Sequence, residues 1–493
     1  MRLARYAHIT VADCVDAAEQ AALCSILHFR DPTAESDWDF KQGTWDGMRT
    51  FFLDKEMRTF PSGLFSHVLL ELAKAGITPV VEDHLPLPVL PQGAPHTALL
   101  DGVTLRDYQV DAISEILRRK RGVVSIAPRG GKTEIQIAVA KLLNVPSILL
   151  VEKKDLLEQH YERFVSRGVG PIGRLGGGHR ELGALHVVAT FQTLWRAIQA
   201  GDTELGNWLQ GLQLAQCDEC HHLGSANTYY QVFAKIPAAY RVGYSGTPLR
   251  VSKGAGFHHA DFALMGATGP RIVEISSKYL RDARYLVEPV VLMPTIQKPS
   301  LWHMHRWPNV HKKGIVENDY RNKIIAQIVR ALHDAGETVL VLVKEIKHGF
   351  SLLKSISEDV DCAMVFGNQR SAVCKRGSLQ HDTQAAQVKQ MLLSGRLRCV
   401  VGSTVYDEGI DLPSLSAVVI GDGGKSTIRT LQRAFRAMTV SEGKTQSYVV
   451  DFIDHTSPML RAQSNKRKAD YEAEGIEVVT SLPIPLRKAF GLA

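Results

Sequence analysis

Short apolar runs alternate with segments of helical spacing along most of the chain, and this alternation restricts the folds open to it. Within 101–285 the runs GVVSIA, SILLVE and LHVVATF are separated by stretches such as KTEIQIAVAKLL. Apolar runs of this length, bounded by turns, indicate strands buried on both faces. Strands that alternate with helices predict a parallel sheet with helices on both faces, the α/β class.

The same alternation begins again near residue 320, which predicts two α/β domains in tandem, at 101–285 and 290–460. The strand candidates of the second are ETVLVLV, LRCVVGS, AVVIGD and QSYVVDF. A length of 493 residues leaves room for a third, smaller domain at about 150 residues per domain. Residues 298–319 are irregular and basic, and we expect a linker or a contact surface there.

The third domain is expected at 1–95, as a small α+β unit. Its short apolar runs accompany GLFSHVLLELAKAGI, whose Leu and Val spacing fits a helix. The Pro-rich run LPLPVLPQGAP at 85–95 breaks regular structure and predicts a linker. At the other end, 461–493 is expected to be a short polar tail. Its basic run should be a solvated face rather than a binding site, and consists of Lys466, Arg467 and Lys468.

The composition is that of a folded globular protein, with 45% hydrophobic and 22% charged residues. No stretch approaches the roughly 20 apolar residues of a membrane helix, and the first residues lack the apolar core of a secretory signal. Seven cysteines, an odd number, fit reduced thiols, so a cytoplasmic location is expected. The formal charge of +7 is compatible with a polyanionic partner but decides little by itself.

The run VVSIAPRGGKTEIQIAV places two glycines and Lys-Thr between an apolar strand and a helix, the context of a phosphate-binding loop. Gly130 and Gly131 would let backbone N–H groups approach phosphates. Lys132 would supply positive charge, and the Thr133 hydroxyl could hold Mg²⁺. The full G-x-x-x-x-G-K-[ST] pattern needs Gly where the chain has Ile126, so an accidental turn is the alternative interpretation of this run alone.

A second chemical signal follows the apolar run LAQC, where DECHH places two adjacent carboxylates after a predicted strand. Nucleotide hydrolysis needs one carboxylate to hold Mg²⁺, here Asp218, and another to orient or deprotonate water, here Glu219. A zinc site is the alternative interpretation, although no second ligand pair lies nearby. Its candidate ligands are Cys217, Cys220, His221 and His222.

The order of these segments resembles that of superfamily-two helicases over about residues 101–455. LRDYQVDAI resembles the segment that reads adenine, SILLVEKKDLLEQH and VVATFQTL resemble strand-contacting segments, and YSGTPLR resembles the coupling motif. In the second half, VGSTVYDEGIDLPSLSAVV resembles motif V and TLQRAFRAM resembles motif VI. The resemblance implies two tandem RecA-like domains that hydrolyse ATP with Mg²⁺.

The resemblance also implies roles for individual residues. The implied ATP contacts are Tyr108, Gln109, Arg129, Gly130, Gly131, Lys132, Thr133, Gly409 and Asp411. The implied metal-holding residues are Thr133 and Asp218, and the implied catalytic residues are Glu219, Gln432 and Arg436. Ser245 and Thr247 would couple hydrolysis to movement. The implied DNA contacts are Lys153, Thr190, Gln192, Ser403 and Thr404.

Two motifs depart from the family pattern. Helicases often carry Gly where this chain has Arg129. Motif VI usually reads Q-x-x-G-R-x-x-R, whereas here Phe435 replaces the Gly and Thr439 replaces the final Arg. Arg436 is therefore the in-register candidate for stabilising the transferred phosphoryl group, and Arg433 is the candidate if the loop is shifted. If Arg436 is the arginine in register, Arg433 is expected at the domain surface or along a cleft edge.

The N-terminal segment resembles the domain that precedes the motor in phage UvsW-like helicases, through KQGTWDGMRTFF and FPSGLFSHVLLEL. That family remodels branched DNA in replication, recombination and repair, so the resemblance favours DNA over RNA, no membrane, and the cytoplasm of a bacterial host. A nuclease site is the alternative interpretation of this segment, because paired carboxylates beside a Lys can bind Mg²⁺. Its residues would be Asp37, Asp39 and Lys41.

Three other functions stay open at this point. The chain could be an RNA helicase, the motor subunit of a restriction or nuclease complex, or a nucleic-acid-binding module whose ATPase has decayed. The altered phosphate loop and motif VI leave room for the last of these.

Overall fold

The computed structural model divides into two compact units, residues 1–276 and 277–493, which are described separately. None of the helices in the described part of the chain is long and apolar enough to cross a membrane. The description covers the whole chain except residues 32–33, 87–88, 225–227, 247–258, 367–369, 376–377, 404–414, 425–432, 434, 439–443, 445 and 481–493.

The first unit is built on a sheet of eight described strands in the order β10-β9-β11-β8-β12-β13-β7-β14. All neighbours are parallel except β10 and β9. The strands are β7 (Arg121–Ile126), β8 (Ser147–Val151), β9 (Ile172–Gly176), β10 (His179–Arg180), β11 (His186–Thr190), β12 (Leu214–Cys217), β13 (Tyr240–Ser245) and β14 (Arg271–Ile275). The helices are α4 (Asp107–Arg119), α5 (Lys132–Leu143), α6 (Lys154–Ser166), α7 (Phe191–Gln199), α8 (Thr203–Gln210), α9 (Thr228–Ala234) and α10 (His259–Ala267).

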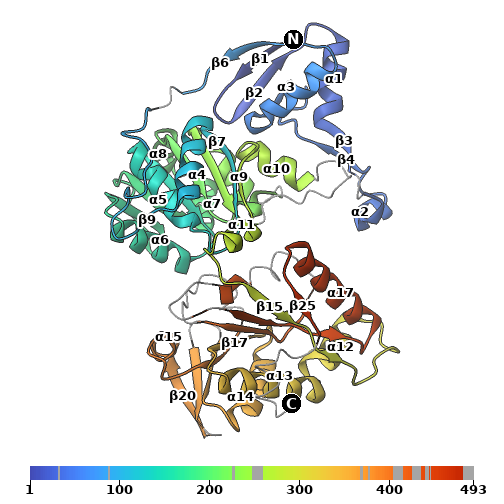
Figure 1. The fold of residues 1–493 in the computed structure, drawn as a ribbon. Coiled ribbons are helices and arrows are strands. Elements are labelled where there is room, and N and C mark those ends of the chain that lie inside the picture. The colour runs from blue at the N-terminus through green and yellow to red at the C-terminus, as the bar shows by residue number, and fades with distance from the viewer. Residues whose placement is uncertain are drawn as a thin grey trace. The chain divides into compact units, whose positions relative to one another are not determined.

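Side chains alternate across this sheet, as strand geometry requires. Along β8, Ile148 and Leu150 belong to one hydrophobic core, while Leu149 and Val151 belong to another. Figure 1 shows helices on both faces of the sheet. Each core therefore joins side chains of the sheet to those of the helices on that face. The predicted parallel α/β sheet is therefore confirmed, and its strands are apolar throughout because both faces are buried.

The N-terminal part of this unit has its own four-stranded sheet, in the order β5-β2-β1-β6. Helix α10 of the larger domain packs against it, because Phe262 and Met265 belong to the same hydrophobic core as Phe60 and Leu64. Gly63 lies so close to the α10 backbone that a Cβ there would clash with the Met265 carbonyl oxygen. The elements are β1 (Arg2–Arg5), β2 (Ile9–Asp13), α1 (Ala17–Leu27), β3 (His28–Arg30), η1 (Ala34–Ser36), α2 (Trp38–Lys41), β4 (Met48–Thr50), β5 (Thr59–Pro61), η2 (Ser62–Leu64), α3 (Phe65–Lys74) and β6 (Val80–Asp83).

The second unit is also α/β, which confirms the prediction of a second sheet. Its nine described strands run in the order β20-β19-β18-β21-β17-β22-β23-β15-β25, and only the pairs made by β19 are antiparallel. The strands are β15 (Pro289–Leu292), β17 (Val339–Leu342), β18 (Cys362–Phe366), β19 (Arg370–Lys375), β20 (Ser378–Gln384), β21 (Cys399–Gly402), β22 (Ala417–Ile420), β23 (Ser447–Val450) and β25 (Val478–Val479). A separate pair is β16 (Thr295–Ile296) with β24 (Ile453–Asp454). The helical segments are α11 (Ser277–Asp282), α12 (Trp307–His311), η4 (Lys312–Val316), α13 (Asp319–Asp334), α14 (Ile346–Ser357), α15 (Ala385–Leu393), η6 (Phe435–Met438) and α17 (Pro458–Ala473).

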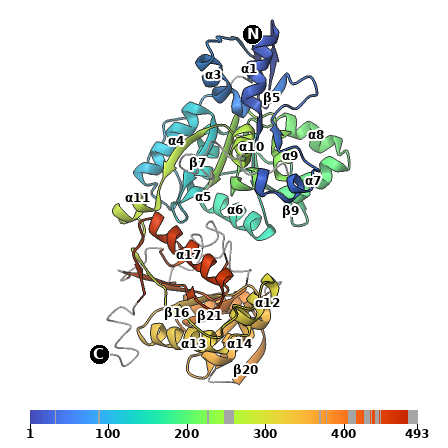
Figure 2. The same ribbon diagram turned by 90° about the vertical axis from the view of Figure 1, so that its right-hand side faces the viewer.

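The chain after residue 460 differs from the polar tail that we expected. It continues through helix α17, seen in Figure 2, and then adds β25 beside β15. The basic run was expected to be a solvated face, and the side chains of Lys466 and Lys468 are indeed exposed to solvent. The expectation is wrong for Arg467, which is buried. Its guanidinium makes two hydrogen bonds to the Asp451 carboxylate, of 2.7 and 2.8 Å, so the charge is neutralised inside the fold.

Candidate nucleotide site

The phosphate loop lies where the sequence predicted it, between the end of β7 and the start of α5. Gly131 caps the helix in the left-handed region, with φ 78°, and a Cβ there would clash with the Gln109 side-chain nitrogen. Arg129, at φ 68°, has the same unusual backbone conformation without being glycine. The loop thus leads directly into the N-terminus of α5, where Lys132 is the first residue, and a helix N-terminus suits an anion.

Tyr108 and Gln109 support this loop from behind. The Tyr108 hydroxyl donates to the Gly130 carbonyl at 2.8 Å, and the Gln109 amide donates to the same oxygen at 3.2 Å. Both residues are buried near the start of α4. The resemblance implied that they read adenine, and the structure places them against the loop backbone, where they fix the loop's shape.

The two carboxylates of DECHH meet the phosphate loop at the carboxyl edge of the first sheet. Glu219 Oε1 lies 2.7 Å from Lys132 Nζ. Asp218 accepts a hydrogen bond from Gln136 Nε2 at 3.2 Å and lies 3.4 Å from His160 Nε2. Carboxyl ends of parallel strands share one edge of a sheet, so a loop after β7 and a turn after β12 come together although 86 residues separate them in the sequence.

The charges of this cluster reinforce one another. Burial acts to raise the pKa of Glu219, but the Lys132 ammonium outweighs it and holds that pKa well below its usual range. Burial also opposes the ionisation of Asp218, yet the hydrogen bond from His160 and the charge of Lys132 lower its pKa. For Lys132, burial disfavours the ammonium while Glu219 and Asp218 raise its pKa above the ordinary value. All three groups are therefore charged at neutral pH.

Ser245, expected in the coupling motif, contacts the same carboxylate. Its hydroxyl donates to Glu219 Oε2 at 3.3 Å and lies 3.0 Å from His221 Nδ1. Glu219 itself has φ 44°, an uncommon conformation for a residue with a side chain. The strand end at Ser245 and the catalytic candidate Glu219 are thus linked by one hydrogen bond.

Sequence reasoning missed Gln136 and His160 as members of this site. Gln136 follows Lys132 by one helical turn, so the i, i+4 spacing could have placed it on the same side of α5. His160 lies on α6 and is the last residue of SILLVEKKDLLEQH, a segment for which the resemblance implied strand contact. Its position beside Asp218 is known only from the fold.

The zinc interpretation of DECHH does not agree with the structure. Cys217 and Cys220 are buried, and burial raises the pKa of both thiols, which keeps them protonated. His221 and His222 instead face the carboxylates of Glu219 and Glu152. In the part of the chain that the structure describes, no group of three His, Cys, Asp or Glu residues could hold a metal ion.

The N-terminal acidic pair, on which the nuclease interpretation was based, has a structural role instead. The Asp37 side chain caps helix α2 by accepting a hydrogen bond from the Asp39 backbone N–H at 2.9 Å. Lys41 ends that four-residue helix. The described residues place no third metal ligand beside the two carboxylates.

The predicted strand-contacting residues have different environments. Lys153 and Gln192 are exposed, and they follow β8 and β11 at the carboxyl edge of the first sheet. Thr190 is buried and its hydroxyl lies 2.8 Å from that of Thr193, while Ser403 is buried in the second unit. Burial argues against side-chain contacts with a strand at these last two positions.

Several predicted site residues lie outside the described part of the structure. These are Thr247, Thr404, Gly409, Asp411 and Gln432. For Arg436 the backbone is described, within the 3₁₀ helix η6, and the side chain is not.

Arg433 corrects one expectation of the sequence analysis. It does not lie at a surface or cleft edge, because it is buried and its guanidinium makes hydrogen bonds of 2.7 and 3.2 Å to the two Asp422 oxygens. Asp422 follows β22, so the pair joins motif VI to the sheet. The expectation failed because the sequence does not show which carboxylate faces an arginine in a loop.

The cluster fits a nucleoside triphosphate with a divalent ion. Lys132 and the N-terminus of α5 would receive phosphates, and Asp218 offers an oxygen of the kind that Mg²⁺ prefers. Thr133 is the second residue of α5, next to Lys132. Few protein ligands are needed, because phosphates and water complete the shell of Mg²⁺ in such sites.

Comparison with known proteins agrees with this geometry. The family model "Type III restriction enzyme, res subunit" matches residues 102–250, and "Helicase conserved C-terminal domain" matches residues 321–440. The DNA 3'-5' translocase XPB2 of Sulfurisphaera tokodaii is 25% identical over 387 residues, which are 73% of this chain and 82% of that protein. The ATP-dependent DNA helicase uvsW of Enterobacteria phage T4 is 23% identical over 379 residues, 73% of this chain and 70% of that protein.

A solved structure supports the fold. S. cerevisiae Dbp5 bound to RNA and ADP BeF3 matches with a TM-score of 0.51 and 15% identity, over 77% of this chain and 90% of that chain. The two family models lie on the two α/β sheets, and the predicted RecA-like arrangement is confirmed. The chain therefore belongs to superfamily two of the helicases, has UvsW and XPB helicases among its relatives, and is an ATP-hydrolysing nucleic-acid helicase.

Proposed function

We propose that this protein is an ATP-driven DNA helicase or translocase that remodels branched DNA in replication, recombination or repair. The observation that carries the motor assignment is the contact of Lys132 with Glu219, beside Asp218, at the phosphate loop. The choice of DNA is supported by relatives whose names describe a DNA translocase and a DNA helicase. The preference for branched DNA rests on the resemblance of the N-terminal segment.

ATP and Mg²⁺ are the cofactors in this proposal, and bound ATP supplies a phosphoryl group that is transferred to water. Lys132 and the α5 amides would bind the phosphates, while Thr133 and Asp218 would hold Mg²⁺. Glu219 would orient the attacking water and accept its proton. Since Lys132 is paired with Glu219 here, phosphate binding would draw the ammonium away and free the carboxylate for this role.

Further contacts in this proposal come from the second unit and from exposed positions. Gln432, Arg436, Gly409 and Asp411 would contact the nucleotide, and Thr247 would act with Ser245 in coupling. Lys153, Gln192 and Thr404 would contact the phosphates of a strand, which moves it without reading its sequence. The domains would be an accessory DNA-binding part at 1–95 and two motor domains at 101–285 and 290–460.

ATPase stimulation by matched nucleic acids tests the proposal. Phosphate release should rise on single-stranded or forked DNA and rise much less on RNA of the same sequence, and the Lys132→Ala variant should show no rise on either. Unwinding of a fork or four-way junction, compared with a linear duplex, then tests the branched preference. Stronger stimulation by RNA would replace DNA helicase with RNA helicase.

A second candidate is the motor subunit of a restriction complex, favoured by the "Type III restriction enzyme, res subunit" match over residues 102–250. It predicts a stable partner subunit that copurifies with the chain. A monodisperse single chain that unwinds DNA unaided would exclude it.

A further inference from the structure

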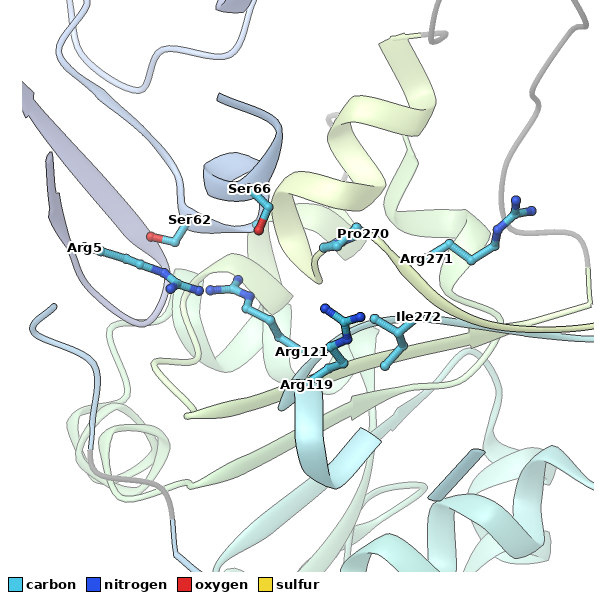
Figure 3. A pocket seen from close by; sticks show the side chains of 9 residues that line it. Arg5, Ser62, Ser66, Arg119, Arg121, Pro270, Arg271 and Ile272 are labelled. Atoms are coloured by element: carbon cyan, nitrogen blue, oxygen red, sulfur yellow. The ribbon is translucent and has the colours of Figure 1, made fainter. Parts of the chain in front are cut away.

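A cavity lined by four arginines lies between the N-terminal sheet and the first α/β domain. Its volume is about 280 Å³. It is formed by the end of β1, the start of η2 and α3, the junction of α4 with β7, and the start of β14. Its polar side chains, shown in Figure 3, are Arg5, Ser62, Ser66, Arg119, Arg121 and Arg271.

Arg121 lines this cavity and is held in place by hydrogen bonds. Its Nε donates to the Thr268 carbonyl at 3.0 Å, and its Nη1 donates to the Ala7 carbonyl at 3.1 Å, so one bond goes to each of the two domains. The residue is only 9% exposed, and its Nη2 is buried without a hydrogen-bond partner among the residues that the structure describes. A buried guanidinium N–H with no acceptor costs free energy, which an anionic acceptor would recover.

Arg5 approaches the same point from the N-terminal sheet. In Figure 3 its guanidinium and that of Arg121 point toward each other, and the Ser66 hydroxyl points toward them. The Arg5 Cζ atom lies 4.5 Å from the centroid of the Phe65 ring, and the Arg5 Nε is also buried with no hydrogen-bond partner in the described part of the chain. The carboxylate nearest to it, Asp83, lies 3.8 Å away and is more than half exposed, so it compensates the charge only weakly.

Positive charge accumulates around these two residues. Arg241 is fully buried and donates to three backbone carbonyl oxygens, so it also lacks a carboxylate in the described structure. Burial is the main cause that lowers the pKa of Arg121 well below its ordinary value, and the positive charges of Arg241 and Arg5 lower it further. Like charges in a region of low dielectric repel one another, so this arrangement of arginines favours the binding of an anion.

The other two arginines of the cavity are compensated. Arg119 lies 3.6 Å from Glu115, and Arg271 lies 2.8 Å from Glu274. Figure 3 shows the Arg271 side chain directed away from Arg5 and Arg121. Both side chains are more than one-third exposed, so they mark the mouth of the cavity and Arg271 offers a matched control.

This cavity is distinct from the nucleotide site. Arg121 begins β7, while the phosphate loop follows Ile126 at the other end of the same strand. At roughly 3.3 Å per residue, the two ends are about 17 Å apart. The cavity therefore lies at the amino edge of the sheet, away from Lys132.

We propose that this cavity binds a phosphate group, with Arg5 and Arg121 as the charged donors and Ser66 as a hydroxyl donor. Guanidinium groups bind phosphate through paired N–H donors, and two of them facing each other match its tetrahedral oxygens. The open mouth admits either free phosphate or a phosphodiester of a nucleic-acid strand. Because the ligand contacts both domains, its binding holds the N-terminal sheet against the motor domain.

Thermal unfolding of the full chain in inorganic phosphate, against chloride of equal ionic strength, tests the proposal without ATP turnover. The experiment should use the Lys132→Ala variant as the parent protein, into which the other substitutions are introduced. Phosphate bound at the nucleotide loop then contributes little to the change in melting temperature. Phosphate should raise its melting temperature, because a ligand that binds only the folded state stabilises it. Arg5→Gln should lose most of this rise, while Arg271→Gln should keep it.

Ser66→Asp tests the site independently in case Arg5→Gln does not fold. The substitution should be tolerated, because Ser66 is exposed in the first turn of α3. Its carboxylate should take the place of the anion, raising the melting temperature without phosphate and removing the response to it. An equal phosphate response in Arg5→Gln, Arg271→Gln and the parent, or no response in the parent, would overturn the proposal.

DNA binding, followed by fluorescence anisotropy over a series of salt concentrations, identifies the source of the phosphate. If it belongs to a strand, Arg5→Gln should weaken binding and lower the slope of log affinity against log salt by about one unit, with Arg271→Gln unchanged. If DNA binding stays at the parental level while the response to inorganic phosphate is lost, the ligand is free phosphate. Either result supports the site. If Arg5→Gln keeps both its DNA affinity and its response to inorganic phosphate, the site is rejected.

Discussion

Lys132 and Glu219 form an ion pair, with Nζ 2.7 Å from Oε1, that links the phosphate loop to the turn after β12. Removal of the ammonium takes away the positive charge that phosphates would meet. Lys132→Ala should therefore abolish ATP turnover while nucleic-acid binding is largely retained. Phosphate release and DNA affinity, measured on the same preparation, check this, and full ATPase activity would show that the loop has been wrongly assigned.

Glu219→Gln tests the other half of the pair. The amide keeps the shape and can still contact Ser245, but it cannot accept a proton from water. Nucleotide binding should be retained, and single-turnover hydrolysis should fall by about 10²–10⁴-fold. A variant that loses ATP binding, with no separate defect in hydrolysis, would mean that Glu219 is structural.

Arg129 stands where the family often carries glycine, and the structure gives this departure a measurable cost. A left-handed conformation at φ 68° is unfavourable for a residue with a Cβ, by about 1–2 kcal/mol. Arg129→Gly should raise the stability of the first unit by about 0.5–1 kcal/mol, once the greater freedom of glycine in the unfolded chain is subtracted. Chemical denaturation of the two proteins measures the difference.

Gly131→Ala is the matched control for that change. A Cβ at this position would clash with the Gln109 side chain, so the substitution should lower stability and ATP affinity together. If Arg129→Gly proves as harmful as Gly131→Ala, the Arg129 side chain contributes more than its backbone costs.

Arg433 should behave as a structural residue, because it is paired with Asp422 inside the second unit. Arg433→Ala leaves a buried carboxylate unpaired and should destabilise that unit by about 3–5 kcal/mol. The double change Arg433→Met with Asp422→Leu should recover part of this loss, since it removes both charges. Equal melting temperatures for wild type and Arg433→Ala would contradict the burial of the pair.

The nucleotide cluster was predictable because its parts follow strands of one parallel sheet. Any residue after the carboxyl end of such a strand comes to the same edge, so Lys132 and Asp218 could be brought together without knowledge of packing. His160 could not, because its contact with Asp218 depends on how α6 packs on the sheet. The alternation of apolar runs likewise predicted both sheets but not the antiparallel strands β19 and β20.

Buried charges were the main failure of sequence reasoning. Arg467 and Arg433 stand in polar segments, where solvent is the ordinary environment, and only the fold places Asp451 and Asp422 opposite them. The shared core of the N-terminal sheet with Phe262 of α10 was missed for a similar reason, because the two partners are about 200 residues apart. Pairings over such separations leave no local signal.

Arg436 remains the candidate for stabilising the transferred phosphoryl group, and the burial of Arg433 changes how it should be tested. Arg433→Ala cannot serve as a mild control, because loss of turnover there would follow from loss of stability. Arg436→Ala should lower turnover by on the order of 10³ while the melting temperature and ATP affinity change little. Arg461→Ala, an exposed arginine on α17, is the matched control and should leave turnover unchanged. If Arg436→Ala retains near-normal turnover while Arg433→Ala, still folded at the assay temperature, is inactive, the catalytic arginine is Arg433 and its pairing with Asp422 must open during the reaction.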